Sequence, residues 1–228
     1  VIAIIFLSIM ATLGIKNRAP GTSEDGTMLE KIKEGFRYVN KTKVILYSIS
    51  LDMFSVMFGG VVAILPVFAE DILHTGVEGL GILRAAPSVG AVLVLLVLSK
   101  FSPMTRAWRN LLWSVAGFGI ATLVFALSES FVLSAAALFL TGAFDSISVV
   151  IRATVLQILV PENMRGRVNA INGIFLSTSN EVGAFESGLA AKLLGAVPSV
   201  VFGGIMTLAV TAYIFIKSKD LFKRDFST

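Results

Sequence analysis

Long apolar segments separated by short polar connections dominate this sequence. Six of them approach or exceed the roughly 20 predominantly apolar residues that a bilayer crossing needs, and none alternates apolar and polar residues with period two. Because lipid cannot hydrogen-bond a free backbone group, segments of this kind cross as helices. The pattern predicts membrane-spanning helices over Val44–Ala69, Leu80–Ser99, Asn110–Leu127, Phe131 to about Val160, Val168–Leu193 and Val200–Ile216.

The residues before Val44 divide into three parts. Val1–Gly14 is apolar but too short to cross alone, so we interpret it as the end of a further helix in a longer protein. Ala19–Thr27 is a polar linker. Met28–Asn40 spaces apolar residues at helical intervals among charged ones, which predicts an amphipathic helix on the membrane surface or on the protein's own loops. We expect a helix end over 1–14, a cytoplasmic linker over 15–43, a six-helix bundle over 44–217 and a tail over 218–228.

Composition and charge agree with a multi-pass membrane protein. The chain has 228 residues, 55% hydrophobic and 15% charged, whereas soluble domains are about 25% charged. The net charge of +4 does not indicate nucleic-acid binding, because Lys and Arg lie in alternate connections and in the tail. Only Lys192 comes near the other side. This positive-inside pattern places the linker and the carboxy terminus in the cytoplasm.

The sequence lacks the motifs of several enzyme classes. It has no GxxxxGK[ST] phosphate loop, no HExxH and no GxSxG, so we expect neither ATP-driven chemistry nor an intramembrane hydrolase within this chain. It contains no cysteine, and its one histidine, His74, lies in a predicted loop. We therefore expect no catalytic residues, no cofactor and no metal site.

Charged residues inside the predicted spans are the candidates for function. A charge at the centre of a membrane helix costs about 2.5–3.5 kcal/mol on insertion scales, so such residues are commonly paired or used. They can form a proton relay or a charged-substrate site, because a buried carboxyl can hold a proton at neutral pH. They can equally form fixed ion pairs that lock helices. Asp145 and Glu181 are predicted to lie deepest, and Arg152 shares the face of Asp145 two turns away. The full set is Asp52, Arg84, Asp145, Arg152, Glu181 and Glu186.

A second set of residues can act as hinges or gates. Pro66 and Pro87 are predicted near the outer ends of their spans, where a break can serve as a hinge. The alternative is that Gly and Pro are simply common in membrane helices. Two glycines of the fifth span, Gly183 and Gly188, permit close helix packing. In the predicted turn Pro161–Arg167, the gate candidates Arg165 and Arg167 can bind helix-end carbonyls or belong to an ordinary basic loop.

The order of these elements resembles a known family. A long basic linker before six closely connected helices resembles the second half of a major facilitator superfamily transporter. Ser179–Gly188 reads SNEVGAFESG and is similar to the GxxxGPxxGG antiporter motif. The match is degenerate, with Ser179, Ala184 and Ser187 replacing Gly, Pro and Gly, so the Pro-Gly kink is missing.

Two further segments extend the resemblance. Lys100–Arg109 lies where the family's GxLaDrxGrr loop recurs and keeps only its basic residues, and Pro161–Phe175 resembles the subfamily that includes the enterobactin exporter. The resemblance implies inverted three-helix repeats and a cavity between this half and an amino-terminal six-helix half. It also implies alternating access and proton-coupled efflux of an amphipathic small molecule, such as a drug or siderophore, across a bacterial inner membrane. A uniporter, an importer and a non-transporting scaffold are the alternatives.

Overall fold

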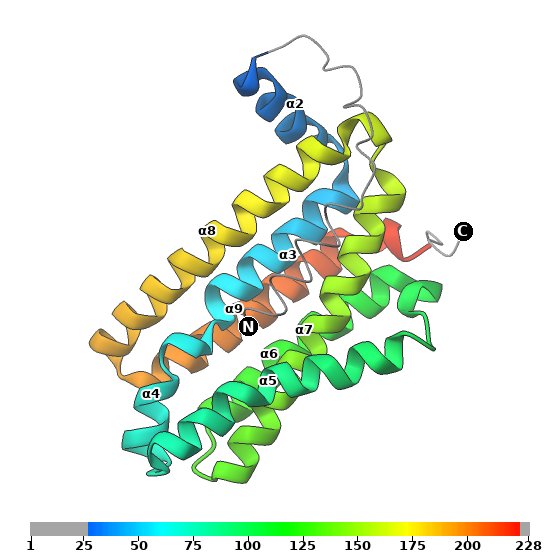
Figure 1. Cartoon of the computed structure of the whole chain (residues 1–228). Helices are drawn as coiled ribbons and strands as arrows, with labels where there is room; N and C mark the ends of the chain where they lie inside the picture. Colours follow the sequence, from blue (N-terminus) through cyan, green and yellow to red (C-terminus); the bar gives the residue numbers. More distant parts are fainter. Residues whose placement is uncertain (1–26, 224–228) are drawn as a thin grey trace, which may run out of the picture.

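The computed structural model describes residues 27–223, which fold into a bundle of long helices without strands (Figure 1). This confirms the predicted all-α architecture. The predicted helix end at residues 1–14 lies outside the described residues. The long helices are α2 (Met28–Lys41), α3 (Lys43–Gly59), α5 (Gly76–Leu98), α6 (Ala107–Ala126), α7 (Phe131–Leu159), α8 (Glu162–Leu194) and α9 (Ala196–Lys217).

The membrane-crossing character of the bundle is clear from length and composition. Five helices of the described part are long and apolar enough to cross a bilayer: α3 with its extension to Ala63, α5, α6 with the turn before it, α7 and α9. Helix α8 has 33 residues but carries several charged and amide side chains. That α8 also crosses the membrane stays a prediction.

Helix α2 begins at a capping box. The Thr27 hydroxyl accepts the Glu30 N–H, and the Glu30 carboxylate accepts the Thr27 N–H at 2.8 Å. These bonds satisfy donors that a helix start otherwise leaves free. One side of α2 packs on α8 through Gly35 and the buried Val39, while Phe36 on the adjacent side is 47% exposed. Helix α2 therefore both contacts its own protein and keeps an exposed apolar edge.

The prediction of one continuous helix over Val44–Ala69 is wrong. Helix α3 ends at Gly59, and a 3₁₀ turn (η1, Val61–Ala63), a short helix (α4, Leu65–Val67) and a π-helical turn (η2, Phe68–Ile72) follow. Gly60 leaves the helical region with φ −71° and ψ 80°. Its carbonyl accepts a hydrogen bond from the Ser187 hydroxyl of α8 at 3.3 Å, so tertiary packing stabilises the break.

Two smaller predictions also need correction. Arg165 and Arg167 lie inside the first turns of α8 and not in a turn, because Pro161 ends α7 and starts α8 directly. Pro87 lies near the middle of α5 and not near its outer end. There its carbonyl faces Gly142 of α7, where an added Cβ would be 1.9 Å from the Pro87 oxygen. The missing side chain at Gly142 lets the two helices touch through their backbones.

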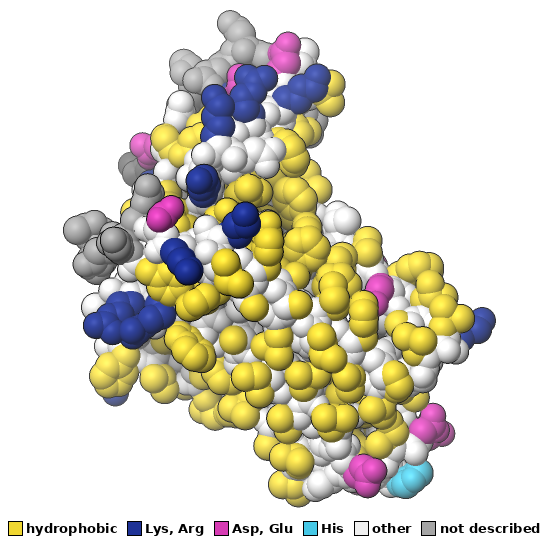
Figure 2. Space-filling view, turned by 180° about the vertical axis from the view of Figure 1, so that it is seen from behind, with side chains coloured by type: hydrophobic (Ala, Val, Ile, Leu, Met, Phe, Trp, Pro, Cys, Tyr) yellow, Lys and Arg dark blue, Asp and Glu magenta, His cyan; other side chains and the backbone are white. Residues whose placement is uncertain are grey.

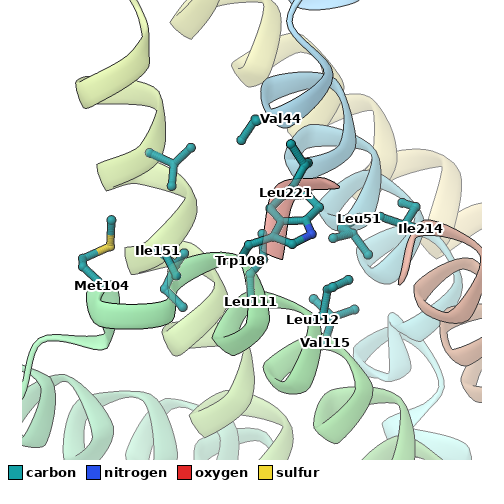
Figure 3. Close-up of a cluster of buried hydrophobic side chains, with 12 residues drawn as sticks. Val44, Leu51, Met104, Trp108, Leu111, Leu112, Val115, Ile151, Ile214 and Leu221 are labelled. Atoms are coloured by element: carbon teal, nitrogen blue, oxygen red, sulfur yellow. The ribbon is translucent and has the colours of Figure 1, made fainter. Parts of the chain in front are cut away.

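The helices form two groups that meet along α6 and α9. Helix α3 contacts α8 and α9, α7 contacts α5 and α6, and α6 packs against α9. Between the groups lies a core around Trp108, with Leu51, Leu111 and Ile151 fully or almost fully buried (Figure 3). The Trp108 indole N–H donates to the Ser218 hydroxyl at 2.8 Å. This core fixes α3 relative to α7, on which the candidate site depends.

Basic side chains are concentrated toward one end of the bundle. In Figure 2 most Lys and Arg side chains lie toward the end that holds α2, the histidine lies at the opposite end, acidic side chains are present at both ends, and an apolar belt lies between them. A belt flanked by polar ends is the surface expected of a protein that crosses a bilayer.

Candidate functional site: a charged cavity beside α3 and α7

The centre of the site is an ion pair between two helices. Asp52 of α3 and Arg152 of α7 lie with Oδ1 and Nη1 2.5 Å apart, and each side chain is only 6% exposed. Neither charge could remain buried alone at modest cost, because desolvating an ion costs several kcal/mol unless a partner offsets it. The partner of Arg152 is therefore Asp52. Sequence spacing could not predict this pair, because the two residues lie on different helices.

Asp145 lies next to this pair without joining it. It precedes Arg152 by seven residues on α7, so the two share a face. Asp145 is half-buried and interacts electrostatically with Arg152 and with Asp52. The predicted shared face thus agrees with the structure, and Asp145 lies within electrostatic range of Arg152 without forming an ion pair with it among the described residues.

Two hollows meet at Asp145. One, of about 340 Å³, is lined by both members of the ion pair and by Asn172. The other, of about 530 Å³, is lined by Arg84 and by residues of α3, α5 and α7. Asp145 and Asn180 line both, so the two hollows adjoin and together form a strip lined by both polar and apolar side chains. Such a strip suits a ligand with both polar and apolar parts.

The structure brings together four of the six predicted intramembrane charges. Asp52, Arg84, Asp145 and Arg152 all line the two hollows, and so does Pro87. Two predicted residues lie elsewhere on α8: Glu181 is exposed, and Glu186 is half-buried but lines neither hollow. Pro66 lies in α4, also outside both hollows.

The remaining gate candidates have separate surroundings. At Gly183 an added Cβ would be 2.7 Å from the Met57 carbonyl oxygen, so this glycine allows α8 to approach α3, whereas Gly188 has no atom within 4 Å of that position. Arg165 donates to the carbonyls of Val160 and Gln157, at 3.2 and 3.1 Å, at the end of α7.

Arg167 binds a different helix. Its Nη1 lies 2.6 Å from Oε2 of Glu34, which ties α8 to α2. The two arginines of the predicted turn therefore contact two different elements at the basic end of the bundle, and neither lies in the cavity.

Two site residues were missed from the sequence. Asn172 and Asn180 are eight residues apart on α8, so they lie on one face and both border the charged strip. The Asn172 Oδ1 atom is buried without a hydrogen-bond partner among the described residues, and Asn180 donates to the Leu176 carbonyl at 2.9 Å. Their regular spacing on a predicted membrane helix was the signal that could have identified them.

The chemistry available here is charge exchange and polar binding. Arg152 pairs with Asp52 and lines the same hollow as Asp145, and the amides of Asn172 and Asn180 add donors and acceptors to its wall. Within residues 27–223 the structure has no group of three or more His, Cys, Asp or Glu that could hold a metal.

Comparison with known proteins defines the class to which this architecture belongs. The family model of the Major Facilitator Superfamily matches residues 1–184. The chain therefore belongs to this superfamily of membrane transporters, as the sequence resemblance predicted.

Among curated proteins the chain is similar to enterobactin exporters. It is 24% identical to Enterobactin exporter EntS of Shigella boydii serotype 18 over 216 residues, which cover 95% of this chain and 52% of the relative. The exporter of Escherichia coli O1:K1 / APEC is 23% identical with the same coverage, and that of Shigella flexneri is 24% identical with 51% of its length covered. The chain thus spans about half the length of the curated relatives it matches. No solved structure matches the chain significantly.

Proposed function

We propose that this chain is the carboxy-terminal half of a secondary active transporter that exports an amphipathic small molecule in exchange for protons. The observation that carries the proposal is the buried Asp52–Arg152 pair with Asp145 beside it, on the wall of a cavity. Charged side chains in membrane helices are costly, so three of them close together indicate either structural ion pairing or a role in transport.

The second wall of the cavity would come from an amino-terminal six-helix half. On α8, small residues at 173, 177, 184 and 188 recur on one side, and Gly173 and Gly188 have no atom within 4 Å of an added Cβ. Gly81 on α5 is equally open. Small residues let membrane helices approach closely, so these faces suit helix packing. Glu181 lies on the same side of α8 and would then face the other half.

The proposed coupling step uses competition for one guanidinium. With Asp145 ionised, Arg152 is shared between two carboxylates. With Asp145 protonated, Arg152 pairs with Asp52 alone, as the short contact between them allows. Proton binding would therefore change how firmly α3 is held to α7, which couples proton movement to a change in the cavity wall.

The direction, the substrate class and the cellular membrane rest on similarity and charge. The relatives are enterobactin exporters by name, which supports efflux of a siderophore-like or drug-like molecule. The strip, lined by both polar and apolar side chains, suits such a ligand. The excess of Lys and Arg at one end supports a cytoplasmic carboxy terminus, and the bacterial relatives support a bacterial inner membrane.

Two alternatives remain as proposals. A uniporter or importer would use the same cavity without proton exchange or in the opposite direction. A non-transporting scaffold is favoured by the short Asp52–Arg152 contact and the near-complete burial of both side chains, which is what a structural lock requires. The two roles differ in whether Asp145 matters, because the lock does not need it.

The test is proton flux in proteoliposomes that hold the full-length protein. Candidate siderophores and lipophilic drugs are added to the side facing the basic end, and the lumenal pH is followed with a dye. We expect flux in the wild type and loss of flux in Asp145→Asn. Glu129→Gln, which removes a carboxylate from the exposed connection between α6 and α7, is the matched control and should transport normally.

Three other results separate the alternatives. Substrate movement without proton flux would indicate a uniporter. Normal flux in a folded Asp145→Asn protein would exclude the proposed relay and leave the charges as a structural lock. No substrate movement and no proton flux with any compound, in a protein that is folded and inserted, would favour the scaffold.

A further inference from the structure

An apolar groove lies on the outside of the bundle between α6 and α9. It has a volume of about 510 Å³, and none of its lining residues borders the candidate site. It is lined by the buried Leu112 and Thr211, by the small residues Ala116 and Ala212, and by the aromatic residues Trp113 and Phe215. The side chains of Trp113 and Phe215 are 67% and 47% exposed, so the groove opens toward the surrounding lipid.

The groove has the length and chemistry of a hydrocarbon-chain site. From Arg109 to Ala116 it follows α6 for two turns, which is about 10 Å of helix rise. Its inner end closes where Leu208 packs on Gly119, since an added Cβ there would be 3.0 Å from Leu208. The Thr211 hydroxyl donates to the Thr207 carbonyl at 2.7 Å, so this polar group is already satisfied.

One charged residue stands at the open end. Arg109 is the only charged residue that lines the groove, it is exposed, and it makes no ion pair among residues 27–223. Arg106, Lys217 and Lys219 are exposed at the same end, and the acidic residue Asp220 is exposed beside them in the 3₁₀ turn η4 (Lys219–Lys223). The local balance is therefore positive.

Aromatic residues line the groove close to Arg109. Trp113 lies one turn below Arg109 on α6, and indole rings are enriched where hydrocarbon meets headgroups. The rings of Phe215 and Phe222 meet edge to face, 5.1 Å apart, at the basic end of the groove. An apolar channel beneath a cation at this level matches a molecule with an acyl chain and an anionic head.

We propose that this groove binds an anionic phospholipid, with one acyl chain between Trp113 and Phe215 and the headgroup phosphate on the Arg109 guanidinium. Arginine suits this role because its planar fork of N–H groups matches phosphate oxygens. The site is independent of the transport cavity, so it does not depend on the proposed function.

The test measures quenching of Trp113 fluorescence by lipids brominated on their acyl chains. The full-length protein in detergent micelles is titrated with brominated phosphatidylglycerol or with phosphatidylcholine of the same chains. The signal is defined as the part that Trp113→Phe removes. We expect saturable quenching that needs about fivefold less phosphatidylglycerol than phosphatidylcholine, as one basic residue near an anionic headgroup implies.

Three variants distinguish a site from general lipid contact. Arg109→Gln should remove the headgroup preference, while Arg106→Gln, which loses the same charge at the same end outside the groove, should keep it. Ala212→Phe fills the groove from an exposed position and should abolish saturation. Quenching that rises in proportion to lipid mole fraction, or a headgroup preference that survives in Arg109→Gln, would overturn the proposal.

Discussion

Removing Arg152 tests how the buried charges are balanced. In Arg152→Gln, Asp52 keeps its 6% exposure but loses the guanidinium 2.5 Å away. Breaking a buried ion pair on one side costs about 3–5 kcal/mol, because the remaining charge is desolvated without a partner. For a domain of this size that cost lowers the unfolding midpoint by about 6–20 °C.

The reverse substitution should cost less. In Asp52→Asn the arginine still has Asp145 within electrostatic range, so a second carboxylate can replace the lost partner. Removing both carboxylates, in Asp52→Asn with Asp145→Asn, should restore the full penalty. Removing both members of the pair, in Asp52→Asn with Arg152→Gln, should recover most of the stability, since a neutral pair leaves no buried charge uncompensated.

The assay is thermal unfolding of the purified protein in one detergent, with all variants at the same concentration. The wild type, Asp52→Asn, Arg152→Gln and their double variant form one double-mutant cycle, which measures the coupling between Asp52 and Arg152 directly. If Arg152→Gln unfolds within about 1 °C of the wild type, or if the Asp52–Arg152 double variant loses the sum of the single losses, the reasoning about burial is refuted. Transport by the stable double variant would further show that the pair is a lock and not a relay.

Two further predictions concern packing and pH. Gly142→Ala should destabilise the protein by about 1–3 kcal/mol, because the new methyl group would clash with the Pro87 carbonyl. Gly166→Ala, with open space around it, should stay within about 0.5 kcal/mol in the same unfolding assay. Hydrogen bonds with the backbone and side chain of Thr27 lower the pKa of Glu30, so its contribution to the start of α2 is present above the unfolded pKa and is lost as pH falls through the lowered value. Amide hydrogen exchange at residues 28–31, corrected for intrinsic rates, should therefore become faster on acidification in the wild type. It should not do so in Glu30→Gln, because the glutamine amide can still close the capping box. Equal pH dependence in both proteins would contradict this account.

The helices were predictable because a bilayer imposes a simple rule on the chain. Apolar length alone placed α6, α7 and α9 within about four residues of their observed ends. The break at Gly60 was not predictable in the same way, since Ser187 contacts it from a helix more than a hundred residues later. The start of α8 was missed because basic residues were read as a loop, although they suit a helix end that projects beyond the lipid.

For the candidate site, the sequence predicted which residues share a face of one helix, but not which residues of different helices are in contact. A seven-residue interval is enough to put Asp145 and Arg152 on one face, and the same kind of interval would have added Asn172 and Asn180. The Asp52–Arg152 contact depends on how far α3 is shifted along α7, which the core around Trp108 sets. Glu181 was expected to lie deep in a buried setting, but depth along a helix does not specify which side of that helix faces the bundle.

The interruption after Gly59 divides one wall of the cavity into two mechanical parts. After it, Phe68 and its neighbours pack with residues of α5, α6, α7 and α9, while before it α3 packs with α8 and the core around Trp108. An unbroken helix would move as one rigid rod, so a displacement of one end would also displace the other. The non-helical backbone at Gly60 removes this rigid connection. A displacement of the segment after Gly60 can therefore be absorbed at that residue, leaving Asp52 in contact with Arg152.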